Sequence, residues 1–524
     1  METYDVVLVG YGPVGQAFSA LCGQAGYKVA AFEAHENIAG MPRAAHLDDE
    51  IMRTMDRIGA GAEIRDDALP WEMYDIRTTA FDGELLTSYD WSHMGRHGWR
   101  AHWIYYQPHV EAAIHRAAVG SGNVEVSFGH RAVELRQGED FSVVVFEDAA
   151  GNRREVRGKY VVGADGANSF VRQALGITVT NGTSGPDRLV IDVAEKHPMS
   201  FEFENGQFAD PVRPGCLFQL GKSHRRFEFQ VFENETAADF TDDKVWELLS
   251  PWGGPDDFIV LQHPIFPFRE VMADTWQAGN CFIIGDAAHV MWPFAGQGMC
   301  SGIRDAATLV WRLDMVLRNL AAPALLDSFT EDRKANAQGW IDRARQIGLP
   351  CIILDPEEIE RRNARMKAEM ADPSLEAPRA ERPGPKAFAH PDDPAAGTQS
   401  IQGTVEVGGR TGLFDEFVGY GWVLVTRTAE VTAALEGRLR TELDYLGVHV
   451  AQVGDADSAA PILDIDGTYG DWFDELDAVA VLVRPDFYVY GATDTAAATV
   501  AMLEQFIGAL DGKPLQSAAR TAGL

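Results

Sequence analysis

Short apolar runs separated by a helical pattern open the chain. Residues 6–9 form a continuous apolar run, which is typical of a parallel strand buried on both faces. Residues 13–26 are compatible with a helix, and a second apolar run at 29–32 ends at Glu33. This order of strand, helix and strand predicts a βαβ unit at the beginning of the chain.

The middle of the chain has a different pattern. Between residues 187 and 270, apolar and polar residues partly alternate, as at 227–231, which predicts an antiparallel sheet with one covered face. A further buried strand is predicted at 282–284. A helix is expected to begin near Gly298, because the apolar residues that follow recur at helical spacing.

A proline-rich stretch separates these elements from the end of the chain. Residues 371–400 contain six prolines, which cannot lie inside one helix, so a linker or extended arm is predicted there. Strand and helix patterns alternate again from residue 401, which predicts a separate small α/β domain. That region has no cysteine, so thiol redox chemistry is excluded there.

Composition narrows the class of protein. The 524 residues include 45 Lys and Arg against 78 Asp and Glu, which gives a net charge of -33. This balance argues against binding to nucleic acid or to an anionic membrane surface. No apolar run approaches the roughly 18 residues of a membrane span. The five cysteines show no CxxC pair and no zinc-ligand spacing, so we expect no metal site and a reducing, cytoplasmic location.

A glycine motif lies between the first predicted strand and helix. Gly10 allows a tight turn, Gly12 lets the backbone approach a pyrophosphate, and Gly15 lets the helix pack closely. Glu33 follows 23 residues after Gly10 and is placed to accept hydrogen bonds from a ribose diol. The pattern predicts dinucleotide binding but does not separate FAD from NAD. The alternative is a glycine-rich turn without a ligand.

Two later segments separate these possibilities. Residues 163–172 read GADGANSFVR, and residues 285–298 read GDAAHVMWPFAGQG. Together with the glycine motif they resemble the single-component (class A) flavoprotein aromatic hydroxylases. Segments 210–214, 224–229, 298–306 and 483–486 are most similar to the hydroxyphenylpropionate hydroxylase branch of that family. One departure is Thr308, where the family commonly has asparagine, which puts one contact near the flavin in doubt.

The resemblance implies an α/β and α+β fold. It implies a Rossmann-like FAD domain from residues 1–180 and 271–370, and an inserted antiparallel substrate sheet at 181–270. A thioredoxin-like domain is expected at 401–524, after the linker. No second GxGxxG unit follows a strand, so NADH or NADPH is expected to dock transiently, reduce FAD and leave.

The activity implied is hydroxylation of a phenol or phenolic acid, with O2 activated as a flavin C4a-hydroperoxide. The loop at 296–298 opens a helix whose N–H groups would stabilise negative charge on the reduced flavin. The resemblance places Arg43 at the pyrophosphate and Gln107 at the ribityl chain, while Asp286 could accept hydrogen bonds from ribityl hydroxyls. The residues expected to bind FAD are Gly10, Gly12, Pro13, Val14, Gly15, Glu33, Ala34, Arg43, Gln107, Asp165, Asp286, Pro293, Gly296, Gln297, Gly298 and Met299.

The substrate site is less well defined by sequence. The residues expected to act in catalysis are Tyr105, Tyr106, His289 and Pro293, with His102 as a further candidate base. Those expected at the substrate are Arg213, Arg225, Phe229, Met291 and Trp292, and Arg226 is a further candidate for a substrate carboxylate. Each polar residue here also has an ordinary structural interpretation, as a core aromatic or a solvent-facing charge.

Alternatives stay open at this point. The same flavin chemistry could act on a polyketide or N-heteroaromatic ring, or insert oxygen in a Baeyer–Villiger reaction. A non-catalytic flavoprotein could instead use the acidic C-terminal domain for protein contacts. A homodimer is also possible.

Overall fold

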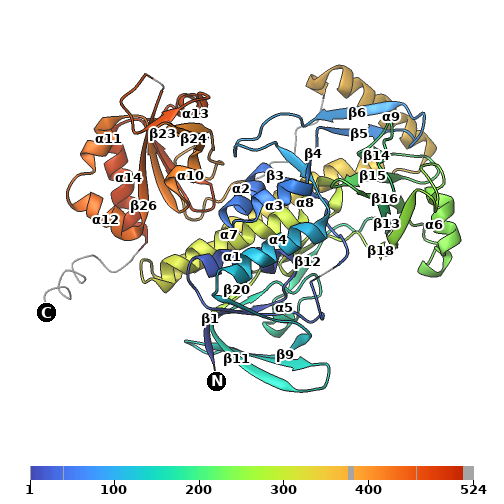
Figure 1. The fold of residues 1–524 in the computed structure, drawn as a ribbon, viewed down its shortest axis with the longest axis horizontal. Helices are drawn as coiled ribbons and strands as arrows, with labels where there is room; N and C mark the ends of the chain where they lie inside the picture. Colours follow the sequence, from blue (N-terminus) through green and yellow to red (C-terminus); the bar gives the residue numbers. More distant parts are fainter. Residues whose placement is uncertain (1, 39, 376–382, 456, 511–524) are drawn as a thin grey trace. The chain divides into compact units, whose positions relative to one another are not determined.

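The computed structural model describes residues 2–38, 40–375, 383–455 and 457–510. These residues form two compact units (Figure 1). The first comprises residues 1–93, 100–303 and 337–381, and the second comprises 94–99, 304–336 and 382–524. Helices α7 (Gly298–Leu317) and α8 (Ser328–Cys351) each contribute residues to both units.

The first unit is built on an eight-stranded sheet with β1 near its centre. The order is β20-β21-β11-β1-β2-β8, with β9 and β10 joined through β11. Strand β1 pairs in parallel with β2 and with β11, and its residues Val6, Val7 and Leu8 are fully buried. Helices α1 (Pro13–Gln24) and α4 (Gln107–Gly120) lie side by side (Figure 1). The predicted Rossmann-like βαβ unit is therefore confirmed.

The strands of this sheet are β1 (Thr3–Val9), β2 (Val29–Phe32), β8 (Val124–Ser127), β9 (His130–Arg136), β10 (Ser142–Asp148), β11 (Arg153–Gly163), β20 (Gln277–Ala278) and β21 (Cys281–Ile283). Two three-stranded sheets accompany it. The first contains β3 (His46–Asp48), β4 (Leu69–Pro70) and β7 (His102–Ile104), and the second contains β12 (Val179–Asn181), β19 (Val271–Ala273) and β22 (His289–Val290). The other α-helices of the unit are α2 (Asp49–Arg57), α3 (Gly61–Asp67), α5 (Phe170–Ala174), α6 (Asp242–Leu249) and α9 (Pro356–Ala371).

A second eight-stranded sheet belongs to the same unit and is called here the substrate sheet, after the role predicted for it from the sequence. Its order is β17-β13-β16-β15-β14-β5-β6, with β18 paired to β13. The strands are β5 (Met73–Arg77), β6 (Leu85–Asp90), β13 (Arg188–Glu195), β14 (Gly206–Phe208), β15 (Gly215–Leu220), β16 (His224–Gln230), β17 (Phe258–Gln262) and β18 (Ile265–Phe266). The sheet extends beyond the predicted 181–270 because β5 pairs in parallel with β14.

Alternation along these strands gives the sheet two unlike faces. One face packs an apolar core that includes Leu189, Leu217, Phe227 and Phe229, covered by residues of α6 such as Leu249. Side chains alternate across a strand, so the intervening residues point to the opposite face. That opposite face holds the polar groups described below.

The second unit contains a seven-stranded mixed sheet in the order β24-β23-β27-β26-β25-β28-β29. Within it, β25 and β26 are parallel, while β28 and β29 are antiparallel to their neighbours, as expected for a thioredoxin-like domain. The strands are β23 (Thr404–Val407), β24 (Arg410–Leu413), β25 (Trp422–Thr426), β26 (Val448–Gly454), β27 (Ile462–Asp464), β28 (Ala480–Val483) and β29 (Val489–Thr493). The helices are α10 (Phe414–Val418), α11 (Ala429–Ala434), α12 (Arg438–Leu446), α13 (Thr468–Glu475) and α14 (Ala496–Ala509).

The predicted linker is partly ordered against this sheet. The backbone N–H of His390 donates to the Tyr490 carbonyl at 2.7 Å, and that of Gly397 donates to the Val489 carbonyl at 2.9 Å. Phe388 is buried in the same unit. Residues 383–400 therefore pack with the C-terminal domain because backbone bonds and an apolar anchor hold them, whereas 376–382 lie outside the described residues.

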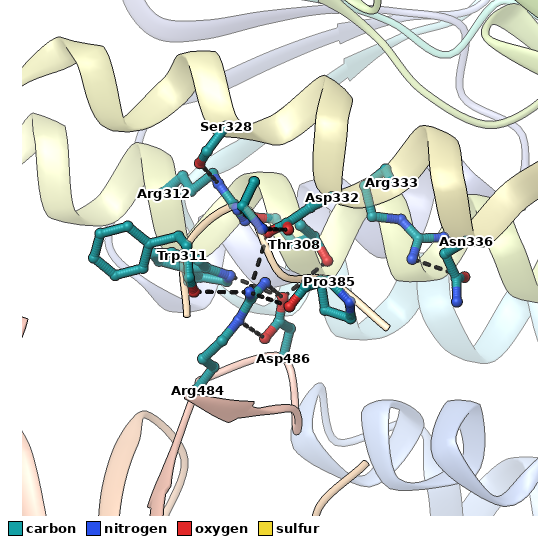
Figure 2. Close-up of polar contacts among 12 residues, drawn as sticks. Thr308, Trp311, Arg312, Ser328, Asp332, Arg333, Asn336, Pro385, Arg484 and Asp486 are labelled. Carbon is teal, nitrogen blue, oxygen red and sulfur yellow. Dashed lines mark hydrogen bonds and ion pairs between the residues drawn. The ribbon is translucent and has the colours of Figure 1, made fainter. Parts of the chain in front are cut away.

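A buried network of ion pairs joins elements of the second unit (Figure 2). Arg484, which follows β28, donates to Asp486 at 2.7 Å and to Asp332 of α8 at 3.1 Å. Asp486 also accepts from the Thr308 hydroxyl at 2.9 Å and the Trp311 indole at 3.0 Å (Figure 2). Thr308, where the sequence departs from the family pattern, therefore uses its side chain for a contact with the thioredoxin-like domain.

Candidate active site

The three motif glycines serve different physical purposes. Gly10 has φ +92°, and a Cβ there would lie 2.5 Å from the Ala164 carbonyl oxygen. A Cβ on Gly15 would overlap the Gly10 carbonyl. At Gly12, no described atom beyond the neighbouring backbone lies within 4 Å of the Cβ position, and the residue borders two cavities. Gly10 and Gly15 are thus required by packing, and Gly12 leaves its space to a ligand.

The first cavity, of about 880 Å³, lies at the ends of β1 and β2. Its lining includes Gly10, Glu33, Ala34 and Asp165. The Glu33 carboxylate accepts hydrogen bonds from the backbone N–H of Tyr11 at 2.8 Å and of His35 at 3.0 Å. Burial alone would raise the pKa of Glu33, but these bonds outweigh it and lower the pKa. Glu33 is therefore a charged acceptor fixed at the cavity wall.

The second cavity, of about 290 Å³, lies between the first glycine turn and the loop before α7. Both cavities are lined by Gly12, Arg43, Ala164 and Gly166, so they adjoin. An elongated dinucleotide can therefore extend from the Glu33 end, past Gly12 and Arg43, to the loop at 286–299. These residues fit FAD, with the helix start at Gly298 offering N–H groups to the flavin end.

Most of the expected FAD residues line these two cavities. Those that do are Gly10, Gly12, Pro13, Val14, Glu33, Ala34, Arg43, Gln107, Asp165, Asp286, Pro293, Gly296, Gly298 and Met299. Gly15 and Gln297 lie behind them. Gly15 packs on Gly10, and the Gln297 amide donates to Asp48 at 3.0 Å. The Asp165 carboxylate accepts from Ser169 Oγ at 2.5 Å and from the Val171 N–H at 3.0 Å, so it also holds the start of α5.

A buried relay of amides fixes the Arg43 segment. Gln107 Oε1 accepts from the backbone N–H groups of Arg43 and Ala44, each at 2.6 Å. Its Nε2 donates to Glu111 at 2.5 Å, and the other Glu111 oxygen accepts from Gln16 Nε2 at 3.1 Å. Burial raises the pKa of Glu111. Sequence reasoning missed Gln16 and Glu111, although the four-residue spacing of Gln107 and Glu111 on one helix face was a usable signal.

His46 was also missed from sequence. It is buried, lines the second cavity, and its Nδ1 lies 3.2 Å from the Gly296 carbonyl, to which it can donate. Its Nε2 lies 2.8 Å from His102 Nδ1. The imidazole, which belongs to β3, thus holds the loop at 286–299, called here the flavin loop, from 250 residues away in the sequence. No local pattern could have revealed this pairing.

The expected catalytic residues are mostly placed elsewhere. Tyr105 is buried with its hydroxyl 3.5 Å from Met299 Sδ, and Tyr106 stacks on His224 at 3.7 Å between ring centroids. His289 stacks on Trp276. Of this set, only Pro293 is among the described residues that line the second cavity.

Among the residues expected to bind substrate, one lines the second cavity and the others lie elsewhere. Met291 lines the second cavity, whereas Trp292 is buried in a neighbouring apolar cluster and Phe229 lies in the core on the other face of the substrate sheet. Arg213 pairs with Glu235 at 2.5 Å. Arg225 is buried and pairs with Glu195 and Glu204. Both guanidinium groups are thus neutralised by carboxylates of the chain itself.

The wall opposite the glycine turn comes from the substrate sheet and nearby aromatic rings. The aromatic lining residues are Trp71, Phe218, Phe268 and Phe294. The polar ones from the sheet are Gln207, Arg226 and Glu228. Arg226 holds Asp192 through two bonds of 2.8 and 3.0 Å and donates to the carbonyls of Pro42 and Arg43. This arginine therefore joins the substrate sheet to the Arg43 segment.

The fold and the site together define a flavin-dependent oxidoreductase. Residues 3–344 match the FAD binding domain family, and residues 397–507 match the HcaD C-terminal domain family. The chain belongs to the FAD binding domain family and is an FAD-dependent aromatic hydroxylase. This bears out the class, the fold and the cofactor expected from the sequence.

Individual relatives give finer comparisons. The chain is 31% identical over 535 residues to a probable NADH-specific resorcinol 4-hydroxylase of Rhodococcus jostii (strain RHA1), covering 99% of this chain and 98% of the relative. It is 31% identical over 519 residues to a 3-(3-hydroxy-phenyl)propionate/3-hydroxycinnamic acid hydroxylase of Mycobacterium sp. (strain KMS), covering 93% and 88%.

Solved structures confirm the fold. The flavin-dependent monooxygenase PieE, in complex with FAD and substrate, aligns with a TM-score of 0.80 at 20% identity over 97% of this chain and 99% of its own. Aklavinone-11 hydroxylase aligns with a TM-score of 0.78 at 22% identity, over 96% and 99%. In the ranges that the structure covers, no helix is both long and apolar enough to cross a membrane.

Proposed function

We propose that this protein uses NADH and O2 to hydroxylate a small phenol bound between the flavin loop and the substrate sheet. The single observation that carries this proposal is the second cavity. Its lining combines Gly12, Pro13 and Gly298 of the cofactor site with aromatic rings and with polar groups of the sheet. A substrate there would lie directly against the cofactor's reactive end.

The chain's own contribution is binding, orientation and exclusion of water. Bound FAD supplies electron transfer from NADH and the activation of oxygen. The N–H groups at the start of α7 would stabilise negative charge at the flavin end of the cofactor. Trp71 and Phe218, whose ring centroids lie 5.4 Å apart, give an apolar wall that orients a ring and keeps water out.

A single aromatic ring is favoured over a polycyclic one by the names of two relatives, a probable resorcinol 4-hydroxylase and a 3-(3-hydroxy-phenyl)propionate/3-hydroxycinnamic acid hydroxylase. NADH as the electron donor is supported by the Rhodococcus jostii relative, whose name describes it as NADH-specific. A reducing, cytoplasmic location is supported by the five cysteines, which are all buried thiols. A homodimer is part of the same proposal, supported by the resemblance alone, and light scattering on the purified protein tests it.

NADH oxidation by the FAD-loaded protein tests the proposed reaction. We expect phenol, resorcinol or 3-(3-hydroxyphenyl)propionate to stimulate NADH oxidation by at least about tenfold, because a bound ring completes the cavity. Mass spectrometry should show one atom from 18O2 in the aromatic product. Methyl ethers of the same compounds are the matched controls, because they lack the ring hydroxyl. If no phenol stimulates NADH oxidation or gains labelled oxygen, the proposal is wrong.

A further inference from the structure

Four polar side chains gather on the cavity face of the substrate sheet, and the proposed reaction leaves their role open. They are Arg188, Gln207, Glu228 and Gln230, here called the sheet-face cluster. Gln207 of β14 lies opposite Cys216 of β15, which lies opposite Glu228 of β16. Arg188 of β13 lies opposite Gln230 of β16. Arg188 and Glu228 are therefore diagonal neighbours across two strands.

Glu228 presents its carboxylate to the cavity. The residue lines the second cavity and is only 8% exposed. Within the described ranges, no basic side chain lies at ion-pair distance from it. The Cys216 thiol contacts it, and the Arg188 and Arg226 guanidinium groups lie near enough to interact with its charge. Buried carboxylates are normally paired or hydrogen-bonded. An acceptor left open at a cavity wall is suited to a ligand that donates a hydrogen bond.

Arg188 carries a positive charge close to two aromatic rings of the cavity wall. Its guanidinium lies 5.7 Å from the ring centroid of Phe268 and 5.8 Å from that of Phe294, and both rings line the cavity. Nη1 donates to the Pro214 carbonyl at 2.8 Å, while Nε and Nη2 are buried without an acceptor among the described residues. Arg213, Arg225 and Arg226 each have a carboxylate partner, so Arg188 differs from the other arginines of this region.

The positions of the Glu228 and Arg188 charges relative to the cavity determine which ligand the cavity accepts. Glu228 lines the cavity, whereas Arg188 is 1% exposed and lies beyond the phenyl rings. Arg226 also lines the cavity, but it is already paired with Asp192, so the unpaired charge of the sheet that a ligand meets is the Glu228 carboxylate. A second carboxylate beside it would put like charges together in a medium of low dielectric, which is strongly unfavourable. A neutral hydroxyl would instead donate to Glu228.

We propose that the sheet-face cluster binds a ring hydroxyl of a neutral phenol and selects against phenols that carry a carboxylate. Glu228 accepts the hydrogen bond from the hydroxyl, and Arg188 balances the charge of Glu228. The bond draws the O–H group toward Glu228 and increases electron density at the ring carbons ortho and para to the hydroxyl. This inference rests on the proposed function and adds a substrate class to it, namely neutral hydroxybenzenes with Glu228 as the residue that contacts them.

Binding measurements on the FAD-loaded protein test this specificity. The probes are resorcinol, which is neutral, and 3-(3-hydroxyphenyl)propionate, which is anionic, each titrated against the flavin absorbance spectrum. We expect the wild-type protein to bind resorcinol at least tenfold more tightly than the acid. Glu228→Gln should weaken resorcinol binding about tenfold and strengthen binding of the acid, because the repulsive charge is gone. A gain in affinity cannot come from a misfolded variant.

Glu235→Gln is the matched control, since this carboxylate pairs with Arg213 away from the cavity. It should leave the ratio of the two affinities unchanged. If the wild-type protein prefers the acid, or if Glu228→Gln leaves the ratio as it was, this inference is overturned while phenol-stimulated NADH oxidation can still stand. If neither probe perturbs the flavin or stimulates NADH oxidation in the wild-type protein, the proposed function fails together with it.

Discussion

At the scale of single residues, identical amino acids in one motif have unlike roles. Gly10 has a backbone conformation that L side chains rarely adopt, and its neighbours leave no room for a Cβ. Gly12 has φ -71° and open space beside it. The first glycine is required by the fold, and the second is required by the ligand.

Substitution by alanine should separate these two roles. Gly10→Ala should destabilise the protein by about 2–4 kcal/mol, because it adds backbone strain and overlaps Ala164 and Asp165. Gly12→Ala should leave the stability of the FAD-free protein nearly unchanged but raise the Kd for FAD at least about tenfold, because its methyl group occupies ligand space. Urea unfolding and FAD fluorescence titration measure the two effects. Equal stability losses for both variants would contradict this assignment.

At the scale of elements, a short turn between β28 and β29 has a large structural role. Arg484 and Asp486 lie two residues apart and are both almost fully buried. They join the thioredoxin-like sheet to α7 and α8 through Thr308, Trp311 and Asp332 (Figure 2). A buried ion pair of this kind is weak evidence for stability by itself, but loss of one partner leaves an uncompensated charge.

Asp486→Asn should therefore destabilise the second unit by about 3–5 kcal/mol. Burial by itself would raise the pKa of Asp486, but attraction to Arg484 and hydrogen bonds from Arg484 and Trp311 lower it to about 2. Because the folded pKa lies below the ordinary value of 3.8, the Asp486 contribution is present above pH 3.8 and is lost as the pH falls through about 2.

Urea unfolding of both proteins at several pH values measures this effect. The difference in unfolding free energy between wild type and Asp486→Asn should be constant near neutral pH and shrink only toward pH 2. The exposed pair Arg96–Glu475 provides the control, and Glu475→Gln should cost less than about 1 kcal/mol. A difference that already disappears near pH 5 would show that Asp486 is not held by this network.

At the scale of the whole molecule, the two units carry different chemistry. The two adjoining cavities lie within the first unit. The same unit holds all five cysteines as buried thiols, namely Cys22, Cys216, Cys281, Cys300 and Cys351. Burial also raises the pKa of Cys216, Cys281 and Cys351, which makes these thiols less reactive.

Thiol labelling should therefore report on the unit that binds FAD. We expect the native protein to show almost no reactive thiol and the fully denatured protein to show five. FAD at 100 times its Kd should stabilise the first unit by about 2.7 kcal/mol and shift the urea midpoint of labelling upward. Labelling in concentrated urea, with and without FAD, is the control and should give five thiols in both cases. Rapid labelling of the native protein would contradict the observed burial.

The sequence by itself determined the elements whose signals are local. The βαβ unit, the glycine turn, Glu33 at the end of β2 and the helix start at Gly298 all follow from residues within a few tens of positions. The hydrophobic periodicity of a helix or strand and the backbone conformation of a glycine depend on residues that are close in the sequence. These features predicted dinucleotide binding and several of the residues that line the cofactor cavities, and the resemblance carried by residues 163–172 and 285–298 then identified the class of protein.

Only the tertiary structure decided which charged groups are available to a substrate. Arg226 forms an ion pair with Asp192, which is 34 residues away in the sequence. His46 contacts the Gly296 carbonyl, 250 residues away. Arg225 is neutralised by Glu195 and Glu204. The strand order places Gln207, Glu228 and Arg188 on one face, although alternation alone could not say which face meets the cavity. The physical reason is that a charge is neutralised by its neighbours in space, and strand pairing sets those neighbours without a local sequence signal.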